Sequence, residues 1–162
     1  MAKRKIVVLG ESDVLRKHAR PVERFDERLG VLLDDMAETM YDANGAGLAA
    51  PQVGILLRAV VIDVGDGLIE LVNPQIAFSN GAKVGVESCL SVPGRCGTVE
   101  RPERVTVCAQ DRRGEPVRLE AEGLLAVCLC HEIDHLDGVV YVDKMIEDVS
   151  DRYRQVRKEE KK

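Results

Sequence analysis

Residues 124–135, which read LLAVCLCHEIDH, predict a buried helix with a metal site on one face. Leu124, Cys128, His131 and His135 follow one another at steps of four, three and four residues, which is a helical period. Two histidines four residues apart lie roughly 5–6 Å from each other on a helix, so both imidazoles can bind one ion. Glu132 stands beside the first histidine, where its carboxylate can accept a proton from a water molecule at the metal. The stretch therefore predicts two metal ligands and a general base.

The segments around this helix predict an α+β domain. Residues 25–41 place apolar side chains at a helical period, and Asn44-Gly45 is typical of a helix end. Residues 45–52, GAGLAAPQ, indicate a glycine-containing loop rather than a helix or a strand. Strand-like runs occupy residues 58–63, 68–72, 82–86, 104–110 and 117–121, with a hairpin turn at 111–116. We therefore expect mostly antiparallel strands surrounding a central buried helix that carries HEIDH.

The end of the chain predicts a helix stop and a charged tail. Gly138 is the expected C-cap of the second helix, and a short apolar run follows at residues 139–142. Residues 150–162 are almost wholly charged, which is typical of a solvated or frayed helix. A chain of 162 residues favours one domain, so we expect a catalytic domain over residues 1–148 and a charged C-terminal tail over residues 149–162.

The composition excludes several classes of protein. Aromatic residues make up only 3% of the chain, so the core must be aliphatic. The net charge of −5 argues against a nucleic-acid binder held by phosphate contacts. No apolar run reaches the length of a membrane span, and the basic start has too short an apolar region for a signal peptide. Five cysteines, an odd number, favour reduced thiols in a cytoplasm over a disulfide framework.

A catalytic metal site needs a third protein ligand, and several residues compete for that place. One family of zinc proteases continues the motif to a third histidine, but this chain has Tyr141 there. Glu147 is the nearest glutamate for a thermolysin-like site. Cys128 lies on the same helix face as His131, and Cys89 lies in the run ESCLS, which interrupts a strand pattern. Spacing alone does not choose between the two cysteines.

Three motifs in a fixed order resemble those of peptide deformylases, which remove the N-formyl group from nascent bacterial-type polypeptides. They are GAGLAAPQ at residues 45–52, ESCLS at residues 87–91 and HEIDH at residues 131–135, and the resemblance runs from residue 14 to residue 142. The resemblance implies that Cys89, His131 and His135 are the metal ligands and that Cys128 lines a pocket beside them. Ligand chemistry alone suggests zinc. The family implies Fe(II), often replaced by nickel, cobalt or zinc on purification.

The same resemblance implies a reaction and its residues. A formamide would be hydrolysed to formate and a free amine, with Glu132 as general base. The Gln52 side-chain amide and the Leu90 backbone N–H would stabilise the oxyanion. The glycines around Ala46 would let a peptide pair with the loop as an added strand. The expected substrate-binding residues are Gly45, Ala46, Gly47, Glu87, Ser88, Arg101, Leu124 and Cys128, with a methionine pocket built from Ala46, Leu124 and Cys128.

Two positions depart from the family pattern, and two other functions stay open. Ser88 stands where the family usually has glycine, and Cys130 replaces the usual glutamine before His131. The alternatives are a metalloprotease of the HExxH type and a non-catalytic, metal-stabilised homologue. Neither departure changes an expected ligand, the base or an oxyanion donor.

The expected partners are N-formylmethionyl nascent chains and, transiently, the ribosome. No specific nucleic-acid sequence and no membrane is expected. Such chemistry fits the cytoplasm of a bacterium or an organelle of bacterial descent. Ribosome contact would involve the basic residues of the tail, which are Arg152, Arg154, Arg157 and Lys158.

Overall fold

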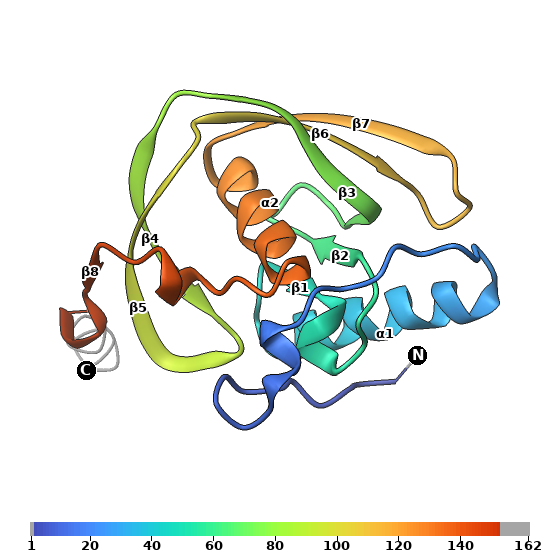
Figure 1. Ribbon diagram of the computed structural model, residues 1–162, viewed down its shortest axis with the longest axis horizontal. Coiled ribbons are helices and arrows are strands. Elements are labelled where there is room, and N and C mark those ends of the chain that lie inside the picture. Colours follow the sequence, from blue (N-terminus) through green and yellow to red (C-terminus); the bar gives the residue numbers. More distant parts are fainter. Residues whose placement is uncertain (1, 153–162) are drawn as a thin grey trace.

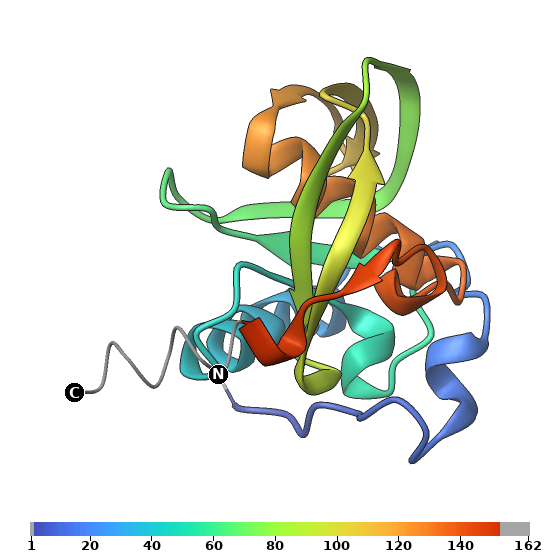
Figure 2. The same cartoon turned by 90° about the vertical axis from the view of Figure 1, so that its left-hand side faces the viewer.

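The computed structural model describes residues 2–152, which form two antiparallel sheets around one central helix, α2 (Gly123–Leu136) (Figure 1). The five-stranded sheet has the order β1 (Gly47–Ala49), β2 (Ala59–Ile62), β3 (Ile69–Asn80), β6 (Arg104–Gln110) and β7 (Pro116–Glu122). The three-stranded sheet has the order β4 (Lys83–Cys89), β5 (Val92–Arg101) and β8 (Glu147–Asp148). In Figure 2 the β4–β5 ribbon stands upright, with β8 beside β5. The expected α+β fold with a central HEIDH helix is confirmed.

Helix α1 (Glu27–Asp42) covers the side of the five-stranded sheet that faces away from α2. The helix begins where the Asp26 carboxylate accepts a hydrogen bond from the Leu29 N–H, at 3.2 Å. Strand β2 separates the two halves of the core, because its residues alternate between them. Val60 and Ile62 pack with α2, whereas Ala59 and Val61 pack with α1. As the composition predicts, both halves are built mainly from aliphatic side chains.

Three strands, β1, β5 and β8, were not predicted from the sequence. Strand β1 lies inside the segment predicted to be a loop and pairs with β2, so that prediction was wrong in part. Strand β5 reads VPGRCGTVER, whose proline, glycines and charges hide any alternation. Strand β8 has only two residues. The hairpin turn at residues 111–116 is confirmed by the Asp111 N–H, which donates to the Glu115 carbonyl at 2.9 Å.

The end of α2 differs by one residue from the prediction. Asp137 is the C-cap, and Gly138 follows it with a φ of +76°. A Cβ atom at Gly138 would lie 2.6 Å from the carbonyl oxygen of Arg16. Gly138 therefore serves both a left-handed turn and a close approach of two backbones.

The first residues of the expected tail pack against the fold. Val149 and Ser150 are buried, and the Val149 N–H donates to the Cys96 carbonyl in β5 at 3.0 Å. Arg154, Arg157 and Lys158 lie outside the described residues. Among residues 2–152, no helix is both long enough and apolar enough to cross a membrane.

Candidate metal centre

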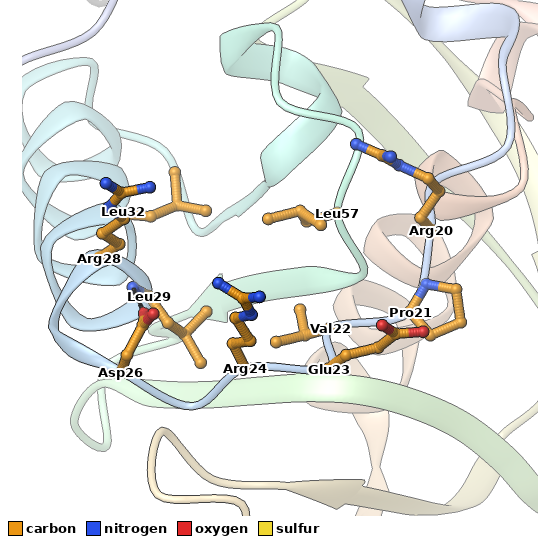
Figure 3. Close-up of a pocket in the computed structure, with 10 residues that line it drawn as sticks. All are labelled: Arg20, Pro21, Val22, Glu23, Arg24, Asp26, Arg28, Leu29, Leu32 and Leu57. Carbon is orange, nitrogen blue, oxygen red and sulfur yellow. Dashed lines mark hydrogen bonds between the residues drawn. The ribbon is translucent and has the colours of Figure 1, made fainter.

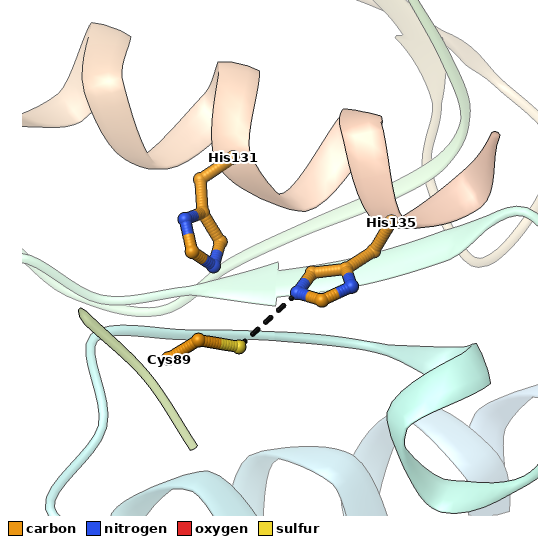
Figure 4. Close-up of side chains that lie close together, drawn as sticks. All are labelled: Cys89, His131 and His135. Atoms are coloured by element: carbon orange, nitrogen blue, oxygen red, sulfur yellow. Dashed lines mark hydrogen bonds between the residues drawn. The ribbon is translucent and has the colours of Figure 1, made fainter. Parts of the chain in front are cut away.

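Cys89, His131 and His135 form a buried cluster of three ligand atoms (Figure 4). The ligand atoms all lie within 4.8 Å of one another, and His135 Nε2 lies 3.3 Å from Cys89 Sγ. A sulfur atom and a nitrogen atom that bind the same zinc ion lie roughly 3.5 Å apart, because zinc–sulfur bonds are near 2.3 Å and zinc–nitrogen bonds near 2.0 Å. One thiolate and two imidazoles suit a transition metal, so the three residues present fit a metal ion. The site joins the helix motif to the end of β4.

The other candidate ligands lie elsewhere. The Tyr141 ring stacks against the His131 imidazole, with centroids 5.9 Å apart and planes inclined at 23°. Glu147 is exposed in β8, where its carboxylate pairs with Arg152. Burial, followed by the charge of Glu132, raises the pKa of the Cys128 thiol to about 12, and this sulfur is not among the three clustered ligand atoms. The sulfur ligand is therefore Cys89 rather than Cys128.

Glu87 orients the first histidine ligand. Its carboxylate accepts a hydrogen bond from His131 Nδ1 at 2.9 Å, which leaves Nε2 for the metal. Arg101 binds the same carboxylate with two donors, at 2.8 and 2.9 Å. Burial opposes ionisation of Glu87, but the bonds from Arg101 and His131 outweigh it and hold its pKa at about 2. Burial is the main cause that lowers the pKa of His135 to about 3, so this imidazole is neutral and can bind a metal.

Glu87 and Arg101, which were expected to bind substrate, thus bind other residues of the protein. The side chains of Glu87 and Arg101 are each only 4% exposed. The third nitrogen of Arg101, Nη1, donates to Asp134 at 2.7 Å. Asp134 was not singled out from the sequence, although its place within HEIDH could have drawn attention to it.

The Glu132 carboxylate lies against the backbone of Gly47. A Cβ atom at Gly47 would stand 2.5 Å from Glu132 Oε2. The other oxygen, Oε1, is buried without a hydrogen-bond partner among the described residues. Burial is the main cause that raises the pKa of this carboxyl to about 7, which suits a group that both accepts and returns a proton near neutral pH.

Gln52 and Leu90 lie beside the ligand Cys89. Gln52 is 1% exposed, and its Nε2 lies 3.5 Å from Cys89 Sγ. Leu90 follows Cys89 directly, and its side chain occupies the space in front of Gly45, where a Cβ atom would lie 2.6 Å from Leu90 Cδ1. The three motifs of the sequence therefore meet at one place.

The expected methionine-pocket residues are more open. Leu124 is 62% exposed, Ala46 is exposed and Cys128 is half-buried. Leu124 thus departs from the buried stripe expected of α2.

The two departures from the family pattern leave the centre intact. Ser88 is exposed at a β-bulge between Glu87 and Cys89, and its φ is not among the positive values of the described residues. Its side chain therefore causes no backbone strain of that kind. Cys130 lies on α2 itself, where its side chain is buried in the core.

A separate pocket of about 620 Å³ lies between the start of α1 and the segment around Leu57 (Figure 3). Arg20, Arg24 and Arg28 stand around an apolar floor that includes Leu29. The pocket shares no residue with the metal centre, so the reaction is not assigned to it.

Comparisons with known proteins agree with this centre. A family model described as polypeptide deformylase matches residues 3–150. The peptide deformylase of Caldicellulosiruptor bescii is 63% identical over 151 residues, which cover 93% of this chain and 90% of that protein. That of Acetivibrio thermocellus is 55% identical over 150 residues, covering 93% and 88%. The crystal structure of peptide deformylase from Thermotoga maritima has a TM-score of 0.87 at 44% identity, covering 90% and 99%.

Proposed function

The chain belongs to the polypeptide deformylase family and removes the formyl group from nascent polypeptides, and we propose that Glu132, Gln52 and Leu90 carry out this reaction at the metal centre. One observation carries the assignment of the base. Glu132 follows the ligand His131 in α2, and one of its buried carboxylate oxygens has no hydrogen-bond partner among the described residues. A buried acceptor without a partner is costly in a folded protein, so its retention favours a proton-transfer role.

The residues divide the hydrolysis among themselves. Cys89, His131 and His135 would hold the metal ion, which supplies Lewis acidity and lowers the pKa of a water molecule. Glu132 accepts a proton from the attacking water. It then donates that proton to the nitrogen of the leaving amine as the C–N bond breaks. The products are formate and a free α-amino group.

Two donors are positioned for the negative charge that develops on the formyl oxygen. Gln52 Nε2 contacts Cys89 Sγ, and the Leu90 N–H belongs to the residue that follows Cys89 in the chain. Donors held in place before the reaction stabilise the transition state without reorganising during it. Both residues are buried or half-buried, which limits competition from water.

The substrate backbone would pair with the free edge of β1. This strand ends the five-stranded sheet; Gly45 and Ala46 lead into it, and Gly47 is its first residue. An extended formylmethionyl peptide could add there as a further strand, with its methionine side chain near Leu124 and Cys128. Ser88 lies on the exposed face of β4 and would border the same peptide. Glu87 and Arg101 serve this substrate indirectly, by positioning His131.

Fe(II) is the proposed native metal, with zinc, nickel or cobalt as possible replacements on purification. Residues 1–148 are proposed as the catalytic domain and residues 149–162 as its tail. We place the enzyme in a bacterial cytoplasm or an organelle of bacterial descent. Arg152 and the basic residues after it would contact the ribosome transiently.

The test is formate release from an N-formylmethionyl peptide by protein purified without oxygen and analysed for metal. The wild-type chain should release formate, and Glu132→Ala should lose nearly all of that activity while keeping its metal. Formate release by Glu132→Ala at the wild-type rate would refute the assignment of the base. Cleavage of internal peptide bonds would instead favour a metalloprotease, and no reaction at any metal loading would favour a non-catalytic homologue.

A further inference from the structure

The side-chain amide of Gln52 is held at both of its ends by the protein. Its Oε1 accepts a hydrogen bond from the Ala49 N–H at 2.9 Å. Its Nε2 donates to Ser91 Oγ at 3.1 Å and, through a longer bond, to Cys89 Sγ at 3.5 Å. Because a backbone N–H can only donate, the oxygen end must face Ala49 and the amino end must face the metal centre.

Ser91 takes one of the two hydrogens that this amino group carries. The second hydrogen is directed to the side of Cys89, where it meets Sγ in the structure and where the formyl oxygen is expected. Ser91 is 0% exposed, so bulk water does not replace its hydroxyl as the acceptor. Without Ser91, the amide would keep its bonds to Ala49 and to the weak acceptor Cys89 Sγ, but would lose the shorter bond that fixes its amino group.

The N-terminal segment fixes the backbones of both partners. The Val7 N–H donates to the Gln52 carbonyl at 2.7 Å, and the Leu9 N–H donates to the Ser91 carbonyl at 2.8 Å. Ser91 also follows Leu90 directly in the chain. The same turn therefore carries the Leu90 N–H, which is one proposed oxyanion donor, and the Ser91 hydroxyl, which holds the Gln52 amide, the other proposed donor. This arrangement ties the two donors to one another.

We propose that Ser91 is a positioning residue that aims the Gln52 amide at the formyl oxygen. The inference rests on the proposed function, in which Gln52 donates to that oxygen. Ser91 touches neither substrate nor metal in this account, and it acts only through Gln52.

A double-mutant cycle on the metal-loaded enzyme tests the inference. Gln52→Ala should lower kcat about 100-fold, as removal of one oxyanion donor does in other hydrolases. Ser91→Ala should lower kcat roughly 10-fold with KM and metal content unchanged, since the donor is misaimed but present. The double variant should be no slower than Gln52→Ala alone, because Ser91 has nothing left to position. Ser91→Cys, which keeps a weaker acceptor, should fall between wild type and Ser91→Ala.

Ser150→Ala is the matched control. Ser150 is also a buried serine whose Oγ is hydrogen-bonded, to the Cys96 N–H at 3.0 Å, but it contacts β5 instead of Gln52. This variant should lower the free energy of unfolding and leave kcat unchanged.

The outcomes separate the inference from the proposed function. If Ser91→Ala keeps the wild-type kcat while Gln52→Ala has a lower kcat, the role of Ser91 is overturned and the role of Gln52 is retained. A double variant whose decrease in kcat equals the product of the two single decreases would also overturn the role of Ser91. Loss of metal from Ser91→Ala would overturn that role as well. Unchanged kcat in Gln52→Ala would overturn both the donor and its positioning residue.

Discussion

At the scale of single residues, the position of the base depends on a missing side chain. Glu132 Oε2 occupies the space that a Cβ atom at Gly47 would fill. The φ of Gly47 is not in the left-handed region, so its backbone does not require glycine. The requirement comes instead from the carboxylate packed against it.

Gly47→Ala should therefore displace Glu132 and lower kcat by about 100-fold, the lower end of what general base catalysis contributes. The fold should persist, because the far end of a glutamate side chain can move. The measurement is kcat for formate release, with circular dichroism to verify the fold. Gly30→Ala is the control, since a Cβ atom there meets only Arg112 Nη1, at 3.5 Å. A wild-type kcat in Gly47→Ala would show that the contact between Glu132 and Gly47 does not position the base.

The choice of sulfur ligand is a second prediction at this scale. Cys89→Ser should lose most of its bound metal, because an alkoxide is harder to form than a thiolate and binds a soft ion less well. Cys128→Ser should keep the metal, because this thiol is outside the ligand cluster. Metal content per chain, measured by mass spectrometry after dialysis, decides between them. Retention by Cys89→Ser with loss from Cys128→Ser would reverse the assignment.

At the scale of elements, Arg101 fastens three of them together. It stands at the end of β5, binds Glu87 in β4 with two nitrogens, and binds Asp134 in α2 with a third. Only arginine offers this planar fork of donors. The helix that carries both histidine ligands is thus tied to the strand that ends at the cysteine ligand.

Arg101→Ala should lower the free energy of unfolding by about 3–5 kcal/mol, because it leaves Glu87 buried without its main partner. Urea denaturation of the metal-loaded protein measures the loss. Arg104→Ala is the control, since Arg104 and Glu122 form a pair whose side chains are 70% and 73% exposed. Its effect should stay below about 1 kcal/mol. Equal effects of the two substitutions would show that the buried pair adds no stability of its own.

At the scale of the whole molecule, a metal ion bound by Cys89, His131 and His135 would connect the two sheets through α2. Cys89 ends β4 of the three-stranded sheet, whereas α2 packs on the five-stranded sheet. An ion that binds only the folded chain stabilises it by mass action, by about 4 kcal/mol at 1,000 times its Kd.

Removing the metal with a chelator should therefore lower the Tm by roughly 10 °C at such an excess of metal. Adding the metal back should restore the Tm. The Tm of Cys89→Ser should respond little to the chelator, because its site is already weak. A wild-type Tm that does not change on metal removal would contradict a role of the ion in joining the sheets.

The sequence alone determined what depends on near neighbours in the chain. The spacing of His131 and His135 placed two ligands on one helix face, and alternation located most strands of the five-stranded sheet. The resemblance in three motifs indicated the third ligand. Strand β5 was missed because its proline and glycines conceal its period, and it becomes a strand only by pairing with β4.

Only the tertiary structure decided the contacts between segments far apart in the chain. It brought Cys89 rather than Cys128 to the histidines, turned Arg101 inward and set Ser91 against Gln52. The physical reason is that helical and strand periods are local properties of the backbone. Which buried groups meet depends instead on how sheets pair and pack, and on the need of each buried polar group for a partner.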